Sequence, residues 1–91
     1  MQIDLLESFR RGVRKLPKSR RREVARAIDA VRDGFGKPHF HSGLGIRRLR
    51  ENYFECRAGI DLRLVFRAEK GCLKFFAAGD HNAIRKLLKG L

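Results

Sequence analysis

Apolar residues recur at helical spacing in two segments near the start of the chain. The first set lies on one side of a helix that Pro17 ends, and consists of Leu5, Leu6, Phe9, Val13 and Leu16. The second set follows Ser19, the predicted N-cap, and consists of Val24, Ala27, Ile28, Val31 and Phe35. Gly34 and Gly36 stop this second helix. We therefore predict a helical hairpin around Pro17.

The periodicity changes after a segment of helix breakers. Residues 37–45 are rich in proline, glycine and histidine, and we expect a loop there. Residues 53–58 and 62–68 then alternate between apolar and mostly charged positions, as in strands with one buried face. Residues 72–78 are apolar on both faces except for Lys74, which predicts a central or well-covered strand.

The remaining segments complete a single domain over residues 1–91. Residues 44–50 predict a strand with a bulge, whereas a further strand over residues 1–6 is left open. Ile84, Leu87 and Leu88 indicate a short C-terminal helix that begins near His81, with Asp80 as its N-cap. The fold class is thus α+β, with an N-terminal helical hairpin packed on a three- or four-stranded antiparallel sheet and a short C-terminal helix.

The charge balance predicts a polyanionic partner. Twenty-two Lys and Arg against 10 Asp and Glu give a net charge of +12, and counterion release makes each phosphate contact favourable at moderate salt. Two alternatives remain at this point, a solvated basic surface without a partner and a basic surface neutralised by an acidic protein.

The chain has few features of export or of metal chemistry. Residues 1–9 contain Asp4 and Glu7 and lack the long apolar stretch of a signal peptide, and no later run is long enough to cross a membrane. Cys56 and Cys72 stand far apart, which favours reduced packing residues over a zinc or redox motif. We therefore expect a cytoplasmic protein without a membrane partner, a metal or a cofactor.

One face of the predicted sheet combines cations with an aromatic side chain. Alternation directs one set away from the helices, and that set consists of Tyr53, Glu55, Arg57, Arg63 and Arg67. Arginine forks suit phosphodiester oxygens and Tyr53 suits stacking on a base. The alternative is a solvated face with cross-strand pairs between Glu55 and arginine.

Histidines supply the candidate groups for proton transfer. His81 follows a Gly-Asp break where a strand meets a helix N-terminus, a place where backbone N–H groups also favour phosphate. His39 and His41 flank Phe40 beside Lys37 and offer a second proton-transfer group. A metal at this His-x-His pair is disfavoured, because no acidic or thiol ligand is near in sequence. Surface or capping roles are the alternative for all three histidines.

The order of elements and several short motifs resemble the RelE/ParE superfamily of bacterial toxins. The matching residues are Leu49, Tyr53-Phe-Glu-Cys-Arg57, Gly59, Leu62-Arg63-Leu-Val-Phe66 and Gly79-Asp80-His81. The resemblance implies a toxin of a toxin–antitoxin pair, a metal-independent endoribonuclease (mRNA interferase) that cleaves messenger RNA, in many members on the ribosome. It also implies an acidic cognate antitoxin.

The same resemblance assigns site residues. Arg63 is similar to a sheet arginine of the family and His81 to its C-terminal histidine, while Asp61 with His81 resembles the pair of the YafQ-like branch. That branch has a histidine where this chain has Arg57, and His41 is an approximate match to its loop histidine. We predict these five as catalytic, with a set of RNA-binding residues made up of Arg67, Lys74, Tyr53, Lys37 and His39.

Two other functions stay open. ParE members poison DNA gyrase and generally lack the histidine, so His81 favours RNA cleavage over gyrase inhibition. A non-catalytic nucleic-acid-binding module is the third possibility. For the antitoxin, the helical hairpin is the predicted docking region, because its first helix has many apolar side chains for one short helix. The alternative is that they belong to the toxin's own core.

Overall fold

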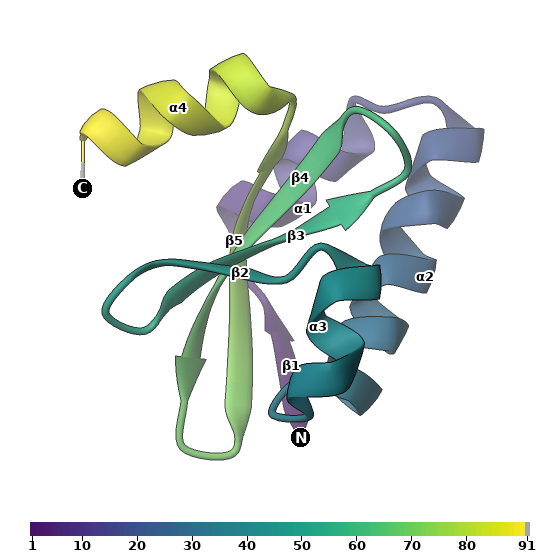
Figure 1. Ribbon diagram of the computed structural model, residues 1–91. Coiled ribbons are helices and arrows are strands. Elements are labelled where there is room, and N and C mark those ends of the chain that lie inside the picture. Colours follow the sequence, from purple (N-terminus) through teal and green to yellow (C-terminus); the bar gives the residue numbers. More distant parts are fainter. Residues whose placement is uncertain (91) are drawn as a thin grey trace.

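The computed structural model describes residues 1–90, which form one mixed sheet with helices on both of its faces (Figure 1). The elements in chain order are β1 (Gln2–Leu5), α1 (Glu7–Arg14), α2 (Lys18–Gly34), α3 (Pro38–Leu44), β2 (Arg47–Arg50), β3 (Tyr53–Ala58), β4 (Leu62–Glu69), β5 (Cys72–Gly79) and α4 (His81–Lys89). The α+β class is confirmed, with five strands in place of the three or four predicted.

The strand order is β1-β5-β4-β3-β2, and this order answers the open question of residues 1–6. β1 pairs in parallel with β5, so that Gln2 lies opposite Cys72 and Leu5 opposite Phe75. All other neighbours are antiparallel. The placement of Leu5 and Leu6 in the first helix was wrong, because Leu5 ends a strand and Leu6 is the N-cap of α1. Four residues are too few for alternation to outweigh a helical spacing.

Two predictions about helix boundaries also need correction. Ser19 does not cap α2, which begins directly after Pro17 with the Arg21 N–H donating to the Pro17 carbonyl at 3.0 Å. The predicted loop over residues 37–45 contains the helix α3, with Pro38 in its first turn. Proline presets the backbone angle of a first helical residue, and Gly45 ends the helix at φ +68°. Both breakers therefore mark the ends of a helix.

The three predicted meander strands are confirmed. β3 and β4 pair from Tyr53 opposite Arg67 to Ala58 opposite Leu62, and β5 lies between β1 and β4 as its two apolar faces predicted. The bulge predicted in β2 lies between Arg48 and Arg50.

The main core lies between the sheet and the first three helices and is built on phenylalanine. Phe66 is fully buried, with ring centroids 4.9 Å from Phe75, 5.6 Å from Phe35 and 5.7 Å from Phe54. Phe9 of α1 packs on Phe75 at 5.5 Å. Burial of each such ring stabilises the fold by roughly 1.5–3 kcal/mol. The helices are thus held against the sheet that carries the functional side chains.

The opposite face of the sheet is partly covered by α4, which extends away from α2 in Figure 1. Val65 points away from the main core yet is fully buried. The helix α4 contacts β4 and β5, and its buried residue is Ile84. The predicted cap is confirmed, since the Asp80 side chain accepts a hydrogen bond from the Ala83 N–H at 2.8 Å. The start of α4 is therefore fixed against the end of β5.

The two cysteines are free, and Cys56 is part of the main core. Burial raises the pKa of the Cys56 thiol from 9.0 to about 12, and the neighbouring Glu55 carboxylate adds to the rise. Among residues 1–90, none of the helices has both the length and the apolar character needed to cross a membrane.

Candidate active site

A small cavity lies where β5 ends and α4 begins, and it gathers three of the predicted catalytic side chains. Its volume is about 220 Å³, and its lining consists of Ile60, Asp61, Arg63, Asp80, His81 and Asn82. Residues distant in sequence meet there because the β3–β4 turn and the β5–α4 junction lie at the same end of the sheet (Figure 1). An imidazole, a guanidinium and a carboxylate therefore border one space.

His81 and Arg63 are placed by regular structure. His81 is the first residue of α4, and its side chain is exposed. Arg63 lies directly opposite Gly79 in the β4–β5 ladder, two residues before His81. A glycine at that register position leaves the Arg63 side chain without a neighbouring side chain on β5. The guanidinium and the imidazole are thus held at one corner by a ladder and a capped helix.

Asp61 is held by a residue of α2. Its carboxylate forms an ion pair with Arg20 at 2.5 Å, and the same guanidinium pairs with Glu23 at 3.2 Å. Glu23 also packs against Gly59, so the first turns of α2 lie against the β3–β4 turn. Arg20 was not among the predicted site residues, because the sequence alone does not reveal which strand turn the start of α2 faces.

Glu55 is the buried polar residue of the basic sheet face. Its side chain is 9% exposed and its Oε2 atom lies 3.2 Å from Arg47 and 3.9 Å from Arg63. A buried carboxylate is stable only with cations or donors beside it, and Arg47 and Arg63 lie on the two strands that flank β3. The cross-strand pairing considered as an alternative is therefore present, and it links Arg63 to β2.

Arg57 lies across the β3–β4 ladder from Arg63 but borders a different cleft. This cleft has a volume of about 290 Å³, and its lining includes Glu23 and Arg26 of α2. The Arg57 guanidinium approaches the Ser42 carbonyl at 3.5 Å, close to Gly45. The turn at Gly59 separates this cleft from the cavity of His81.

The predicted RNA-binding residues fall into two groups. Tyr53, Arg67 and Lys74 lie on strands of the basic face, where Tyr53 packs edge-on against Phe76 at 5.6 Å. A hydrogen bond to the Tyr53 hydroxyl, together with Glu69, raises the pKa of Arg67. Glu69 also pairs with Arg67 and Lys74, at 3.4 Å each. Tyr53 and Arg67 thus share one surface, as alternation predicted, and Lys74 lies opposite Arg67 in the β4–β5 ladder.

The second group lies apart from the cavity, around α3. Lys37 and His39 border a groove of about 450 Å³ between α2 and α3. His41 stacks on Phe35 with a centroid distance of 5.6 Å, and its Nε2 atom accepts a hydrogen bond from the Gly36 N–H at 3.1 Å. The structure therefore does not bring His41 together with His81, and its catalytic assignment stays a prediction.

The chain has a RelE-like fold. Solved structures with this fold superpose on most of the chain. YafQ from Escherichia coli aligns with a TM-score of 0.71 and 15% identity, covering 91% of this chain and 96% of that chain.

Chains from two complexes of RelE with RelB are similar as well. The matching chain of the archaeal RelE–RelB complex from Pyrococcus horikoshii aligns with a TM-score of 0.69 and 14% identity, covering 87% of this chain and 92% of that chain. The match in the Methanococcus jannaschii RelB–RelE antitoxin–toxin complex has a TM-score of 0.69 and 15% identity, covering 92% and 96%. No protein-family model and no curated protein matches the sequence.

Proposed function

We propose that the protein is the toxin of a toxin–antitoxin pair and an endoribonuclease that cleaves messenger RNA without a metal. The observation on which this rests is the cavity that brings Asp61, Arg63 and His81 together. The likeness to RelE and YafQ structures supports the same class. The ribosome is the proposed place of action, in the cytoplasm.

In the proposed reaction, the ribose 2′-hydroxyl attacks the adjacent phosphorus and the bond to the 5′ oxygen of the next nucleotide breaks. Asp61 accepts the proton of the hydroxyl, and His81 donates a proton to the departing oxygen. Arg63 binds the non-bridging oxygens, whose negative charge increases in the transition state. The products are a cyclic 2′,3′-phosphate and a 5′-hydroxyl, so atoms and charge balance.

Each residue acts through the contacts described above. Glu55 limits the movement of Arg63 from one side, and the Asp80 cap fixes the backbone from which His81 projects. Arg57 and Arg26 flank the neighbouring cleft, where a further phosphate of the same strand can bind.

One comparison of three activities tests the proposal. Messenger RNA cleavage, gyrase supercoiling and growth are measured for the parent protein, His81→Ala and Arg63→Ala, with Arg32→Ala as a control for arginine removal. We expect cleavage to fall by about 10²-fold or more in both site variants and to be unchanged in the control. Full cleavage by His81→Ala contradicts the mechanism. Supercoiling inhibited by the parent and by His81→Ala would instead identify a gyrase inhibitor, and neither activity would leave a binding module.

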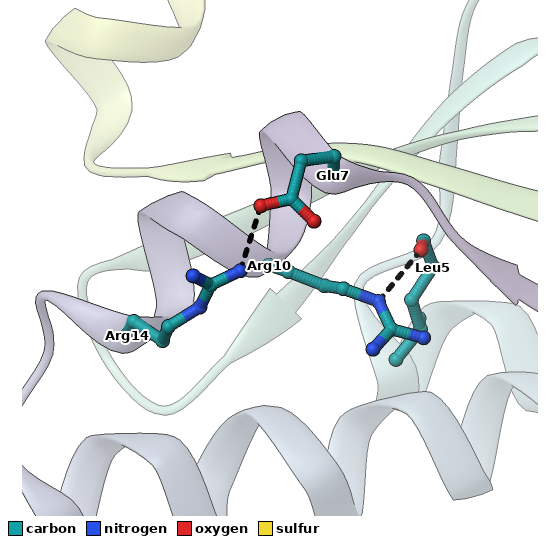
Figure 2. Close-up of polar contacts among 4 residues, drawn as sticks. All are labelled: Leu5, Glu7, Arg10 and Arg14. Carbon is teal, nitrogen blue, oxygen red and sulfur yellow. Dashed lines mark hydrogen bonds and ion pairs between the residues drawn. The ribbon is translucent and has the colours of Figure 1, made fainter.

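The antitoxin is proposed to dock in the groove between α1 and α2. This groove has a volume of about 340 Å³, an apolar floor that includes Leu5 and Val13, and a rim that includes Arg10, Arg14 and Arg21. Figure 2 shows Arg10 and Arg14 between the two helices, where Arg10 donates to the Leu5 carbonyl at 3.0 Å and Arg14 pairs with Glu7 at 2.8 Å. An amphipathic helix with acidic flanks matches such a surface.

Not every apolar residue of the hairpin is available for this docking. Phe9 is 1% exposed and packs on Phe75, so it belongs to the core, as the alternative interpretation held. Phe9→Asp would unfold the protein, so this variant cannot test the docking of the antitoxin. Reversal of Arg10 and Arg14 to glutamate is the better test, with the same change at Lys86 and Lys89 of α4 as the matched control. The proposal is wrong if an acidic protein encoded beside this chain copurifies equally with both variants.

A further inference from the structure

The positive charge of the chain is concentrated at the corner between α1 and α2. Residues 10–26 contain nine Lys and Arg and a single acidic residue, Glu23, which gives +8 of the total of +12. Three of these cations, Lys18, Arg22 and Arg26, follow one another at intervals of four, so they form a stripe along one side of α2. We call these three residues the α2 stripe.

The α2 stripe lies on the exposed side of its helix. Its three members are exposed, whereas Val24 and Val31 on the other side of the helix are buried. Among residues 1–90, acidic groups pair with Arg14, Arg20 and Arg32 of the first two helices, and none pairs with a member of the stripe. The three cations are therefore free to bind an external anion.

The stripe opposes the stability of its own helix. The N-terminal end of a helix favours acidic side chains, yet the first turn of α2 has none, and Asp29 and Asp33 lie in its second half instead. Like charges four residues apart also repel each other. Where the local charge pattern disfavours the helix without an evident structural gain, a functional role is expected.

The stripe is connected to the candidate active site by two contacts of α2. Arg26 borders the same cleft as Arg57, and Arg20, in the turn between Lys18 and Arg22, pairs with Asp61 of the cavity. An extended polyanion that enters the cavity can therefore continue past the Gly59 turn onto the outward face of α2. A stripe of three residues at intervals of four spans about 12 Å along the helix.

We propose that the α2 stripe binds the phosphate backbone of the RNA beyond the point of cleavage, as a second contact surface of the toxin. The inference rests on the proposed function, since it assumes an RNA substrate. The exposed residues between the three cations include Ser19 and Ala25, so no large apolar side chain is present to anchor a protein partner. The apolar groove suited to such a partner lies on the other side of the α2 start, beside Arg21.

The experiment compares two triple variants that each remove three exposed cations. The stripe variant replaces Lys18, Arg22 and Arg26 with glutamine, and the control variant replaces Lys70, Lys86 and Lys89 with glutamine. Two of the control residues lie on α4, which is across the molecule from α2 in Figure 1. Binding to a single-stranded RNA and to an RNA hairpin is measured by fluorescence anisotropy over a salt series, in the His81→Ala background to prevent cleavage.

We expect the stripe variant to reduce the slope of log affinity against log salt by about 2, because each lost phosphate contact contributes about 0.7 for single strands. Its affinity at 0.1 M salt should be on the order of 10²-fold weaker, with a smaller change in the control. A larger loss on the hairpin than on the single strand would identify duplex RNA as the ligand. The stripe variant should melt no lower than its parent, since it removes charges that oppose the helix.

Three results would overturn the inference. Equal slopes for the two triple variants would mean that net charge alone matters. Unchanged RNA binding with lost binding to polyglutamate would assign the stripe to an acidic protein. If the parent cleaves RNA while the stripe variant binds RNA as tightly as the control variant does, this inference is wrong and the proposed nuclease function stands. A parent protein that neither cleaves nor binds RNA would contradict both proposals.

Discussion

The ion pair between Arg20 and Asp61 offers a test of how the proposed base is held. Arg20→Ala removes the only α2 side chain that pairs with the cavity among the described residues 1–90, and it also removes the contact to Glu23. Asp61 then stays on the β3–β4 turn but loses the cation that orients it. Arg20 is thus proposed as a positioning residue, since it does not border the cavity itself.

The structure predicts a small effect on stability and a large one on activity. The Asp61 side chain is 61% exposed and that of Arg20 30%, so solvent screening limits the pair to between about 0.2 and 1 kcal/mol. For a domain of this size, that loss lowers Tm by no more than about 8 °C. A displacement of a reacting group by about 1 Å, in contrast, can cost about 10²-fold in rate. Arg20→Lys keeps the cation and should restore part of the lost rate.

A double-mutant cycle separates positioning from general damage. Single-turnover cleavage is measured for Arg20→Ala, Asp61→Asn and the double variant, and thermal melting for all three. If Arg20 acts through Asp61, the loss from Arg20→Ala disappears when Asp61 is already replaced. Additive losses in the double variant, or a normal rate in Arg20→Ala, would refute the reasoning.

Three further predictions concern the surroundings of the site. Asp80→Ala should destabilise the protein by about 1 kcal/mol in urea unfolding, because the Ala83 N–H loses its cap, while Asp80→Asn should cost much less; equal losses would exclude the cap. The pKa of Cys56 is raised to about 12 in the fold, so between pH 9 and 12 the unfolded chain loses the thiol proton first and stability falls by about 1.4 kcal/mol per pH unit. Cys56→Ala should lack that component of the alkaline slope, as urea unfolding at several pH values would reveal, and parallel slopes would contradict it. Gly45→Ala should cost about 1–2 kcal/mol and displace Arg57, because φ is +68° and the added Cβ meets that side chain; an unchanged melting temperature would show that the strain is absent.

The sheet was predictable wherever alternation extended over several residues. β3, β4 and β5 are six to eight residues long, and their periodicity alone identified the core side chains Leu64 and Phe66. β1 has four residues and gains its partner from the far end of the chain, so no local pattern could distinguish it from a helical start. The breakers Pro38 and Gly45 were recognised, but a proline and a glycine seven residues apart enclose a short helix as readily as a loop.

The candidate site followed from the sequence in part. Asp61, Arg63 and His81 lie together as the resemblance implied, because each is fixed by a strand end or a helix start. Arg20 and the buried state of Glu55 could not be predicted, since both depend on which elements pack side by side. His41 lies apart from the cavity, where its side chain accepts a hydrogen bond from the Gly36 N–H, so its predicted catalytic role is untested by this geometry.

The parallel pairing of β1 with β5 has a consequence for synthesis of the protein. Gln2 must find Cys72, seventy residues later, before the sheet acquires its full set of hydrogen bonds. Contacts of such large sequence separation form late and slow folding. Because β1 and α1 both depend on β5, a growing chain shorter than about 80 residues lacks the surface on which its first two elements fold. A nascent chain therefore cannot complete its sheet or its candidate site until β5 and the start of α4 have been made.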